Sequence, residues 1–377
     1  MLWILLILSI LFPIYVYVGY PAILYILRKN SDIVIPELKY IGDISIIMVV
    51  CNEEKNIEKK INNLLELNYS GGSVEIYIVD DASNDNTLTI AQSFGDKIKC
   101  ISSQGRLGKS NGLNLAMSKV TTELVMMVDC RQELDSNVLI NLSSWFKGEP
   151  SMGAVSGELM FKSVGSNDFS SGMDGYWKYE KFIRSSEAII GSVPGVTGAL
   201  YMLRVSSYRE LPVDTLLDDV QIPMIAASLG YKVGFDARAI AWDTPSVSLG
   251  NEKRRKIRTL SGNYQLLQRF PFWVLPFGHP IWWQFFSHKI ARLIAPFSAI
   301  FSLFLGLILT SRGDTIALLY TIMFISGLSI YPILRVFPVM NKIGLLKLVS
   351  SFITLNWFCI LAFLHYFSGI QSGSWKK

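Results

Sequence analysis

The chain has 377 residues, enough for two or three domains of roughly 150 residues each. Half of its residues are hydrophobic, 17% are charged and the mean hydropathy is +0.35. Soluble domains are about 25% charged, so this composition excludes an ordinary soluble protein and indicates an integral membrane protein. The net charge of +5 is too small to indicate nucleic-acid binding. The four cysteines show no C-x-x-C spacing, which argues against a disulfide scaffold or a zinc site.

The first apolar run precedes the first charged residues. No residue from Leu2 to Leu27 is charged, and Arg28 follows directly. This length spans about 30 Å of hydrocarbon. A cleaved signal peptide is the alternative, but no basic region precedes the run and no clear cleavage site is present. We therefore predict a transmembrane helix within residues 1–29, with Arg28 on the cytoplasmic side.

A second apolar region follows a stretch rich in Trp, Phe and Pro. Residues 271–292 suit the membrane interface, and residues 293–377 hold about three spans. We predict these spans at Leu293 to Thr310, Thr315 to Leu334 and Leu348 to Ile370. The loop before the last span carries Arg335, Lys342 and Lys347 and no acid, so the positive-inside rule places it in the cytoplasm.

Residues 38–270 alternate short β-rich runs with amphipathic stretches, which is typical of an α/β domain. The runs at 44–50, 74–79 and 124–128 are largely apolar or β-branched, as parallel strands covered on both faces require. Polar residues follow each run: Asn52 and Glu53, Asp80 and Asp81, and Asp129. Ligands bind beyond the carboxyl ends of such strands, so we expect these side chains to share one crevice of a cytoplasmic domain.

Each of these polar residues also has a purely structural explanation. Asp81 suits hydrogen bonds to a nucleobase or ribose. The structural alternative is that Asp80 serves only to brace a loop and Asp85 serves only to cap a helix. Lys109, at a predicted helix start, can neutralise a diphosphate. Asp129 could hold a divalent cation against that diphosphate or merely cap a turn.

Two further groups lie later in the chain. Asp218 and Asp219 open a predicted helix, where one could act as a general base or both could cap the helix. Arg255 and Arg258 share a helical face within a basic run that reaches either phosphate oxygens or lipid headgroups. Trp177 lies in an aromatic cluster suited to sugar stacking or to packing at the membrane edge.

Taken together, these motifs resemble the membrane glycosyltransferases of family 2, which include hyaluronan, chitin, cellulose and poly-N-acetylglucosamine synthases. The resemblance extends from about Ile44 to Phe270. The segments that carry it are Val49 to Glu53, Asp80 to Thr87, Gly108-Lys109 with Leu113-Asn114, Gly198-Ala199 and Asp218-Asp219. It implies a GT-A-like domain with a mostly parallel sheet, flanked by transmembrane helices.

The resemblance also implies residue roles. Asp219 would be the catalytic base, and Trp177, Gly198 and Asp218 would contact the acceptor. The donor would be bound by Asn52, Glu53, Asp81, Lys109, Asp129, Arg255 and Arg258. Asp129 would also hold Mg²⁺ or Mn²⁺.

Three positions depart from the family pattern. The D-x-D metal motif reads Asp129-Cys130-Arg131, and the Q-x-x-R-W motif reads Arg255-x-x-Arg258-Thr259. Gly112 stands where the family has alanine. The first departure removes a metal ligand, and the second removes a tryptophan from the acceptor platform.

These observations predict an inverting glycosyltransferase of the cell membrane, active in polysaccharide synthesis at the cytoplasmic face. Its donor would be a nucleotide sugar, a uridine diphosphate sugar in particular, and its acceptor a saccharide or a polyprenyl-linked sugar. Membrane lipid and polysaccharide-assembly proteins would be its other partners. Arg131 favours one alternative, a catalytically silent scaffold in a polysaccharide export complex. Release of the nucleoside diphosphate would distinguish the two.

Overall fold

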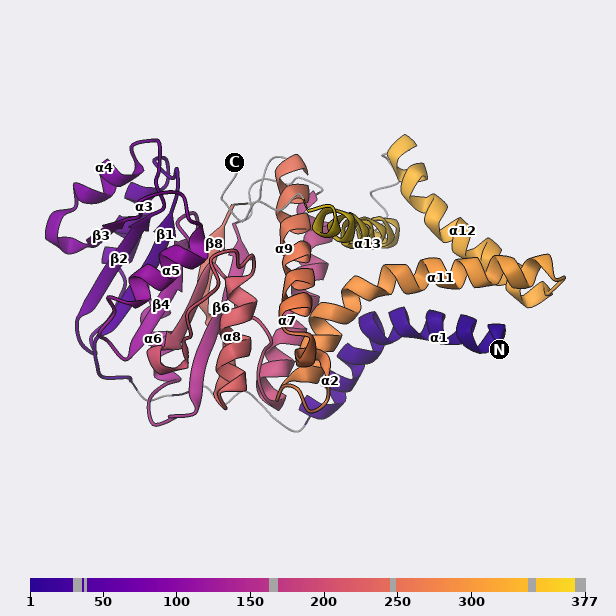
Figure 1. Ribbon diagram of the computed structural model, residues 1–377, viewed down its shortest axis with the longest axis horizontal. Coiled ribbons are helices and arrows are strands. Elements are labelled where there is room, and N and C mark those ends of the chain that lie inside the picture. Colours follow the sequence, from indigo (N-terminus) through magenta and orange to yellow (C-terminus); the bar gives the residue numbers. More distant parts are fainter. Residues whose placement is uncertain (30–35, 37–38, 163–168, 245–248, 338–343, 370–377) are drawn as a thin grey trace.

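The computed structural model describes every residue except 30–35, 37–38, 163–168, 245–248, 338–343 and 370–377. A sheet-containing domain forms one end of the molecule, and long apolar helices extend from the other (Figure 1). Helices α7 (Phe169–Ile190) and α9 (Leu249–Arg269) lie between these two parts.

An eight-stranded sheet forms the core of the domain, in the order β3-β2-β1-β4-β7-β6-β8-β5. Four of the pairings are parallel and three are antiparallel. The three predicted strands are present as β1, β2 and β4, and the predicted α/β class is confirmed. The strands are β1 (Ile44–Val50), β2 (Val74–Asp80), β3 (Lys99–Ser102), β4 (Leu124–Val128), β5 (Glu133–Leu134), β6 (Met152–Phe161), β7 (Leu200–Arg204) and β8 (Lys232–Asp243).

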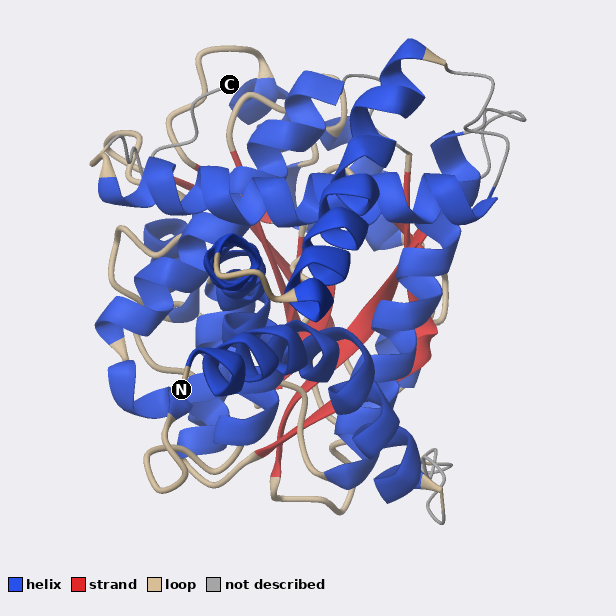
Figure 2. Cartoon of the chain, turned by 90° about the vertical axis from the view of Figure 1, so that its right-hand side faces the viewer, coloured by secondary structure: helices blue, strands red, loops and turns tan. Residues whose placement is uncertain are grey.

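Helices cover both faces of this sheet. Ile47 and Val49 of β1 pack on one face in a cluster that includes α5 residues, whereas Ile46 and Met48 pack on the other with α3 residues. Because both faces are buried, the central strands β1 and β4 are largely apolar and do not alternate between polar and apolar residues. Figure 2 shows the strands behind the helical layer. The domain helices are α3 (Ile57–Leu65), α4 (Thr87–Gln92), α5 (Lys109–Met117), α6 (Val138–Ser144) and α8 (Asp218–Ser228).

The topology brings several chain segments to one edge of the sheet. The parallel strands β1, β2 and β4 end there, with Val50 opposite Asp80. Strand β7 is antiparallel to β4 and therefore starts there, with Leu200 opposite Val128. The loop before β7 thus meets the residue after β4, where the Asp129 amide lies 3.5 Å from the Ala199 carbonyl oxygen.

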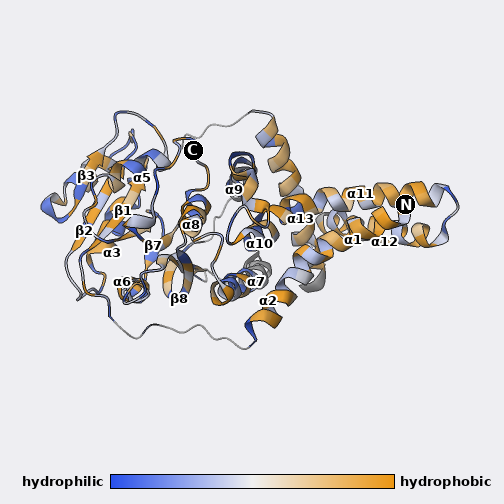
Figure 3. Cartoon of the chain, turned by 60° about the horizontal axis from the view of Figure 1, so that its bottom comes forward, coloured by the Kyte–Doolittle hydropathy of each residue, from blue (hydrophilic) through white to orange (hydrophobic). Residues whose placement is uncertain are grey.

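Four helical segments of the described chain are long and apolar enough to cross a membrane: Leu2–Arg28, Trp282–Ser311, Thr315–Leu334 and Val349–Phe367. Figure 3 shows that their residues are predominantly hydrophobic, and many large apolar side chains on them are exposed, as expected in lipid. The elements are α1 (Leu2–Ile14), α2 (Tyr20–Arg28), α10 (Trp282–Phe285), α11 (Ala291–Ser311), α12 (Thr315–Val336) and α13 (Gly344–Phe367), with π-helical turns at Tyr15–Gly19 and Phe286–Ile290.

The helix that contains the second candidate span begins before the predicted start of that span. Residues 282–292, expected as part of an interfacial segment, are helical and continue into α11. The charges at Lys289 and Arg292 hid this continuity, because they interrupt the apolar run on which the prediction depended. Lys342 and Ile370 lie outside the described residues, and the division into domains at residues 29, 38, 270 and 293 stays a prediction.

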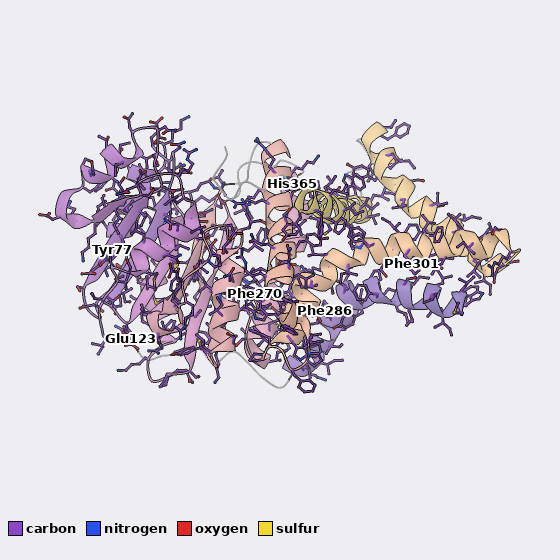
Figure 4. All side chains as sticks on the ribbon, viewed as in Figure 1. Tyr77, Glu123, Phe270, Phe286, Phe301 and His365 are labelled. Atoms are coloured by element: carbon purple, nitrogen blue, oxygen red, sulfur yellow. The ribbon has the colours of Figure 1, made fainter. Side chains whose placement is uncertain are left out.

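A buried ionic cluster joins α7 to the membrane helices. The Tyr20 hydroxyl donates to Glu187 Oε1 at 2.5 Å, and His288 Nδ1 lies 2.9 Å from the same oxygen. His288 Nε2 lies 3.0 Å from Glu180 Oε2, and Arg292 pairs with Glu180. Around it, aromatic side chains of both parts fill the junction, where Figure 4 labels Phe270 and Phe286.

Gly112 explains one of the departures from the family pattern. It lies on the buried side of α5, and a Cβ atom at this position would be 2.6 Å from Val49 Cγ1. Helix α5 therefore approaches β1 more closely than an alanine permits.

We predict that Gly112→Ala lowers the stability of the protein by about 1–3 kcal/mol through overpacking, although alanine favours helices. Thermal unfolding in detergent measures this change. Gly327→Ala is the matched control, because no atom lies within 4 Å of the added Cβ in α12. Equal unfolding midpoints for the two variants would contradict the close approach of α5 to β1.

Candidate active site

Lys109 lies at the centre of the candidate site. It is the first residue of α5 and follows Gly108, whose φ of 90° favours glycine. The Lys109 ammonium lies 3.0 Å from Asp129 Oδ1 and 3.1 Å from Asp218 Oδ2. Asp129 directly follows β4, and Asp218 is the first residue of α8. Three elements that are far apart in the sequence therefore meet at one ammonium group.

The acids around Lys109 keep it charged. Burial disfavours the ammonium form, but Asp129 and Asp218 outweigh burial and raise the pKa of Lys109 above its usual value. The site thus combines one fixed positive charge with three neighbouring carboxylates, since Asp219 follows Asp218.

Asp219 differs from the other two acids. Burial, together with the adjacent charge of Asp218, raises its pKa to about 6, although Lys109 acts in the opposite direction. Among the described residues, no hydrogen-bond donor engages its carboxylate. A Cβ atom at Gly198 would lie 3.5 Å from Asp219 Oδ2, so this glycine leaves space beside the carboxylate. Asp219 therefore has the pKa and the adjacent space that a general base requires.

The acid missing from the metal motif is replaced by a structural ion pair. Arg131 Nε and Nη2 lie 3.1 and 2.6 Å from the two carboxylate oxygens of Asp243, at the end of β8. The guanidinium thus forms a bidentate ion pair with Asp243. No cluster of three metal-ligating side chains occurs among the described residues. Asp129 remains 36% exposed, and Mg²⁺ can bind through one carboxylate together with substrate phosphates, so a metal fits here as a partner of the diphosphate.

Residues predicted to bind the donor nucleotide lie around the ends of β1 and β2. Asn52 and Glu53 line a cavity of about 390 Å³ together with Asn84 and Asp85. Asn52 has a φ of 56°, and its Oδ1 accepts a hydrogen bond of 2.8 Å from the Asn84 amide. This pair holds the loops after β1 and β2 together.

Asp81 supports a loop in this structure. Its two carboxylate oxygens accept hydrogen bonds from the amides of Leu107 and Gly108, at 2.8 and 2.9 Å. Only 1% of the residue is exposed. Asp81 thus fixes the loop that leads to Lys109, which is the kind of bracing role that the sequence had offered for Asp80. Its contact with a nucleotide stays a prediction.

A larger cavity, of about 550 Å³, lies where the domain meets the membrane helices. Trp177 and Arg255 line it, and Trp177 packs against Phe161 with ring centroids 5.2 Å apart. Arg258 is exposed and is not among the lining residues. The structure therefore separates the two arginines that the sequence had placed on one functional face.

Sequence reasoning missed two cations near Asp219. Arg184 donates to Thr197 Oγ1 at 2.7 Å, beside Gly198. Lys289 lies near Gly195, whose added Cβ would be 3.5 Å from the Lys289 ammonium nitrogen. A charged residue within an apolar helix is a recognised signal of function, so Lys289 could have been found. Arg184 offered no such signal.

The comparisons with known proteins agree with this geometry. Residues 45–211 match the model of the family described as glycosyl transferase family 2. Poly-beta-1,6-N-acetyl-D-glucosamine synthases of Staphylococcus aureus (strain COL) and Staphylococcus epidermidis are 25% and 24% identical, over 67% and 65% of this chain. The matched regions cover 64% and 60% of those relatives, so the chain spans less than two thirds of their length.

A solved structure resembles nearly the whole chain. The mannosyltransferase PcManGT from Pyrobaculum calidifontis, in complex with GDP-Man and Mn²⁺, has a TM-score of 0.72 at 18% identity. The match covers 96% of this chain and 99% of that one and supports the fold alone. It confirms the GT-A-like architecture with attached apolar helices.

The site and the fold thus define a membrane protein that has a nucleotide-sugar transferase domain. Within it, residues 45–211 are the part that matches glycosyl transferase family 2.

We predict that Lys109→Met destabilises the protein by roughly 3 kcal/mol, because three carboxylates lose their shared counter-charge. The loss of stability will be larger above pH 6 than near pH 4, because protonation of Asp219 at the lower pH relieves part of the repulsion between the carboxylates. Thermal unfolding in detergent at both pH values measures it.

Lys59→Met is the matched control for this prediction. Lys59 pairs with Glu133 at 2.5 Å, but its side chain is 75% exposed, so its loss should cost about 1 kcal/mol or less. A Lys109→Met deficit that is small, or that does not depend on pH, would contradict the electrostatic role of Lys109.

Proposed function

We propose that this protein transfers a sugar, with inversion, from a nucleoside-diphosphate donor to a hydroxyl of a saccharide or lipid-linked acceptor. The observation that carries the proposal is the convergence of Asp129, Asp218 and Asp219 around Lys109, with the pKa of Asp219 raised to about 6. A base with this pKa is ionised at neutral pH and remains basic enough to accept a proton.

The residues would act at two ends of the reaction. Asp219 removes the proton from the acceptor hydroxyl as its oxygen forms a bond to the anomeric carbon of the sugar. The bond from that carbon to the diphosphate breaks, and its electron pair stays with the diphosphate oxygen. Attack from the face opposite the leaving group inverts the anomeric configuration. Lys109 and the N-terminus of α5 stabilise the charge that accumulates on the diphosphate.

A divalent cation, when bound, would supply further positive charge to the diphosphate. Asp129 is the residue that would hold it, and Arg131 would not contribute because it is paired with Asp243. The structural neighbour was solved with Mn²⁺, which is consistent with a metal at the corresponding site of this chain.

The donor and the membrane face are finer parts of the proposal. The staphylococcal relatives are named for a polymer of N-acetylglucosamine, which favours a uridine diphosphate sugar as the donor. The structural neighbour was solved with GDP-Man, so both nucleotides belong in the assay. The basic residues after the first span favour a cytoplasmic catalytic domain.

We expect Asp219→Asn to lower turnover about 10²- to 10⁴-fold, because the amide cannot accept the hydroxyl proton. Release of nucleoside diphosphate from UDP- and GDP-linked sugars by purified full-length protein measures this.

Turnover of the unmodified protein should also fall about tenfold per pH unit well below pH 6, as Asp219 becomes protonated.

Asp96→Asn is the control, because Asp96 is an exposed acid outside the site. Its turnover should match that of the unmodified protein at every pH. Turnover by Asp219→Asn equal to that of Asp96→Asn would exclude Asp219 as the base.

The same substitution should raise stability at neutral pH. The pKa of Asp219 is about 6 in the folded protein and about 3.9 in an unfolded chain, so its ionisation above pH 6 opposes folding. Asp219→Asn removes this cost and should stabilise the protein by on the order of 1–2 kcal/mol above pH 6. The gain should shrink as the pH falls from 6 to 4 and vanish well below pH 3.9, where the carboxyl is protonated in both states. A gain that is constant between pH 4 and pH 8 would contradict the raised pKa.

A further inference from the structure

The cavity of about 550 Å³ between the domain and the membrane helices is strongly basic. Its described lining contains seven lysine and arginine side chains, one histidine and two acidic side chains. The acids are already paired: Glu158 with Lys181 at 2.7 Å, and Glu180 with Arg292. The lining therefore carries a large excess of positive charge.

Two of these cations are available to a ligand. Among the described residues, the Lys289 ammonium and the Arg255 guanidinium make no hydrogen bond or ion pair with the protein. Both side chains are partly buried. Partly buried charges without a partner are costly, so an anionic group that enters the cavity would be bound strongly.

The cavity also has an apolar wall contributed by the membrane helices. Tyr17 belongs to the first predicted span, and Leu355 and Cys359 belong to the last. An anion without a lipid chain would contact only the cations and would leave the apolar wall unused. Cations beside the side chains of two membrane spans fit a lipid that has a charged headgroup.

This cavity adjoins the candidate base. An added Cβ at Gly195 would lie 3.4 Å from Lys289 Cε, and the next residue, Val196, donates its amide to the Asp219 carbonyl oxygen at 2.8 Å. One short loop therefore separates Lys289 from Asp219. A sugar attached to an anion at Lys289 could present its hydroxyl to the Asp219 carboxylate.

We propose that the acceptor is a saccharide linked to a lipid through a phosphate or diphosphate, and that Lys289 and Arg255 bind this anionic linkage. The inference rests on the proposed function for the role of Asp219, and it narrows the acceptor to one class. A neutral polysaccharide needs no such cations, so it does not explain the charge of the cavity.

Binding of radiolabelled farnesyl diphosphate to the full-length protein tests this proposal. The protein is placed in phosphatidylcholine nanodiscs without donor. We expect farnesyl diphosphate to bind at least tenfold more tightly than farnesol or inorganic pyrophosphate, because the site recognises both the charge and the chain. Lys289→Met and Arg255→Met should each weaken binding about tenfold, which corresponds to 1.4 kcal/mol. Lys289→Arg should restore most of the affinity.

Lys147→Met is the control, because Lys147 is an exposed lysine outside the cavity. It should leave binding unchanged. The binding assay contains no donor and requires no turnover, so failure of this proposal is distinguishable from failure of the transferase proposal.

Competition experiments identify the outcomes that would overturn the proposal. Displacement by UDP would assign the cations to the donor, and displacement by phosphatidylglycerol would reduce them to general lipid contacts. Equally tight binding of pyrophosphate would show that the lipid chain is not recognised. Equally tight binding of farnesol would show that the charge is not recognised. Equal competition by N-acetylglucosamine oligomers would assign the cavity to a neutral polymer.

Discussion

The attraction between the Lys109 ammonium and the carboxylates around it is the interaction on which the site depends. Asp129, Asp218 and Asp219 repel one another, and without a shared cation the end of β4 and the start of α8 would separate. Several features of the fold serve to hold Lys109 in place. Asp81 fixes the preceding loop, and Gly112 lets α5 lie directly on β1. In the proposed reaction, the same charge would stabilise the leaving diphosphate.

Much of the fold could be predicted from local sequence patterns. Strands β1, β2 and β4 are continuous apolar runs with polar residues at their ends, and these patterns carry both the sheet and the location of the crevice. The membrane helices were recognisable because a span requires only length and apolarity. The early start of the helix that contains the second candidate span was not predicted, because Lys289 and Arg292 interrupt its apolar run.

The parts that could not be predicted depend on contacts between distant residues. The pairing of Arg131 with Asp243 joins positions that are 112 residues apart, so the sequence showed the loss of an acid but not where the arginine would bind. The exposed position of Arg258 depends on how α9 is rotated against the domain. The sequence could not show that Asp81 holds the loop before Lys109, because adjacent aspartates after a strand look alike in sequence. Only the tertiary structure distinguishes Asp81 from Asp80.

The buried cluster of Glu180, Glu187, His288, Arg292 and Tyr20 has a consequence for how the protein can move. It fastens α7 to the first and second membrane segments through charged groups that would be costly to separate in a nonpolar setting. Movement of α7 relative to these two segments would have to break the buried contacts between Glu180, Glu187 and their partners. A mechanical force on the first two apolar segments would therefore pass directly to α7.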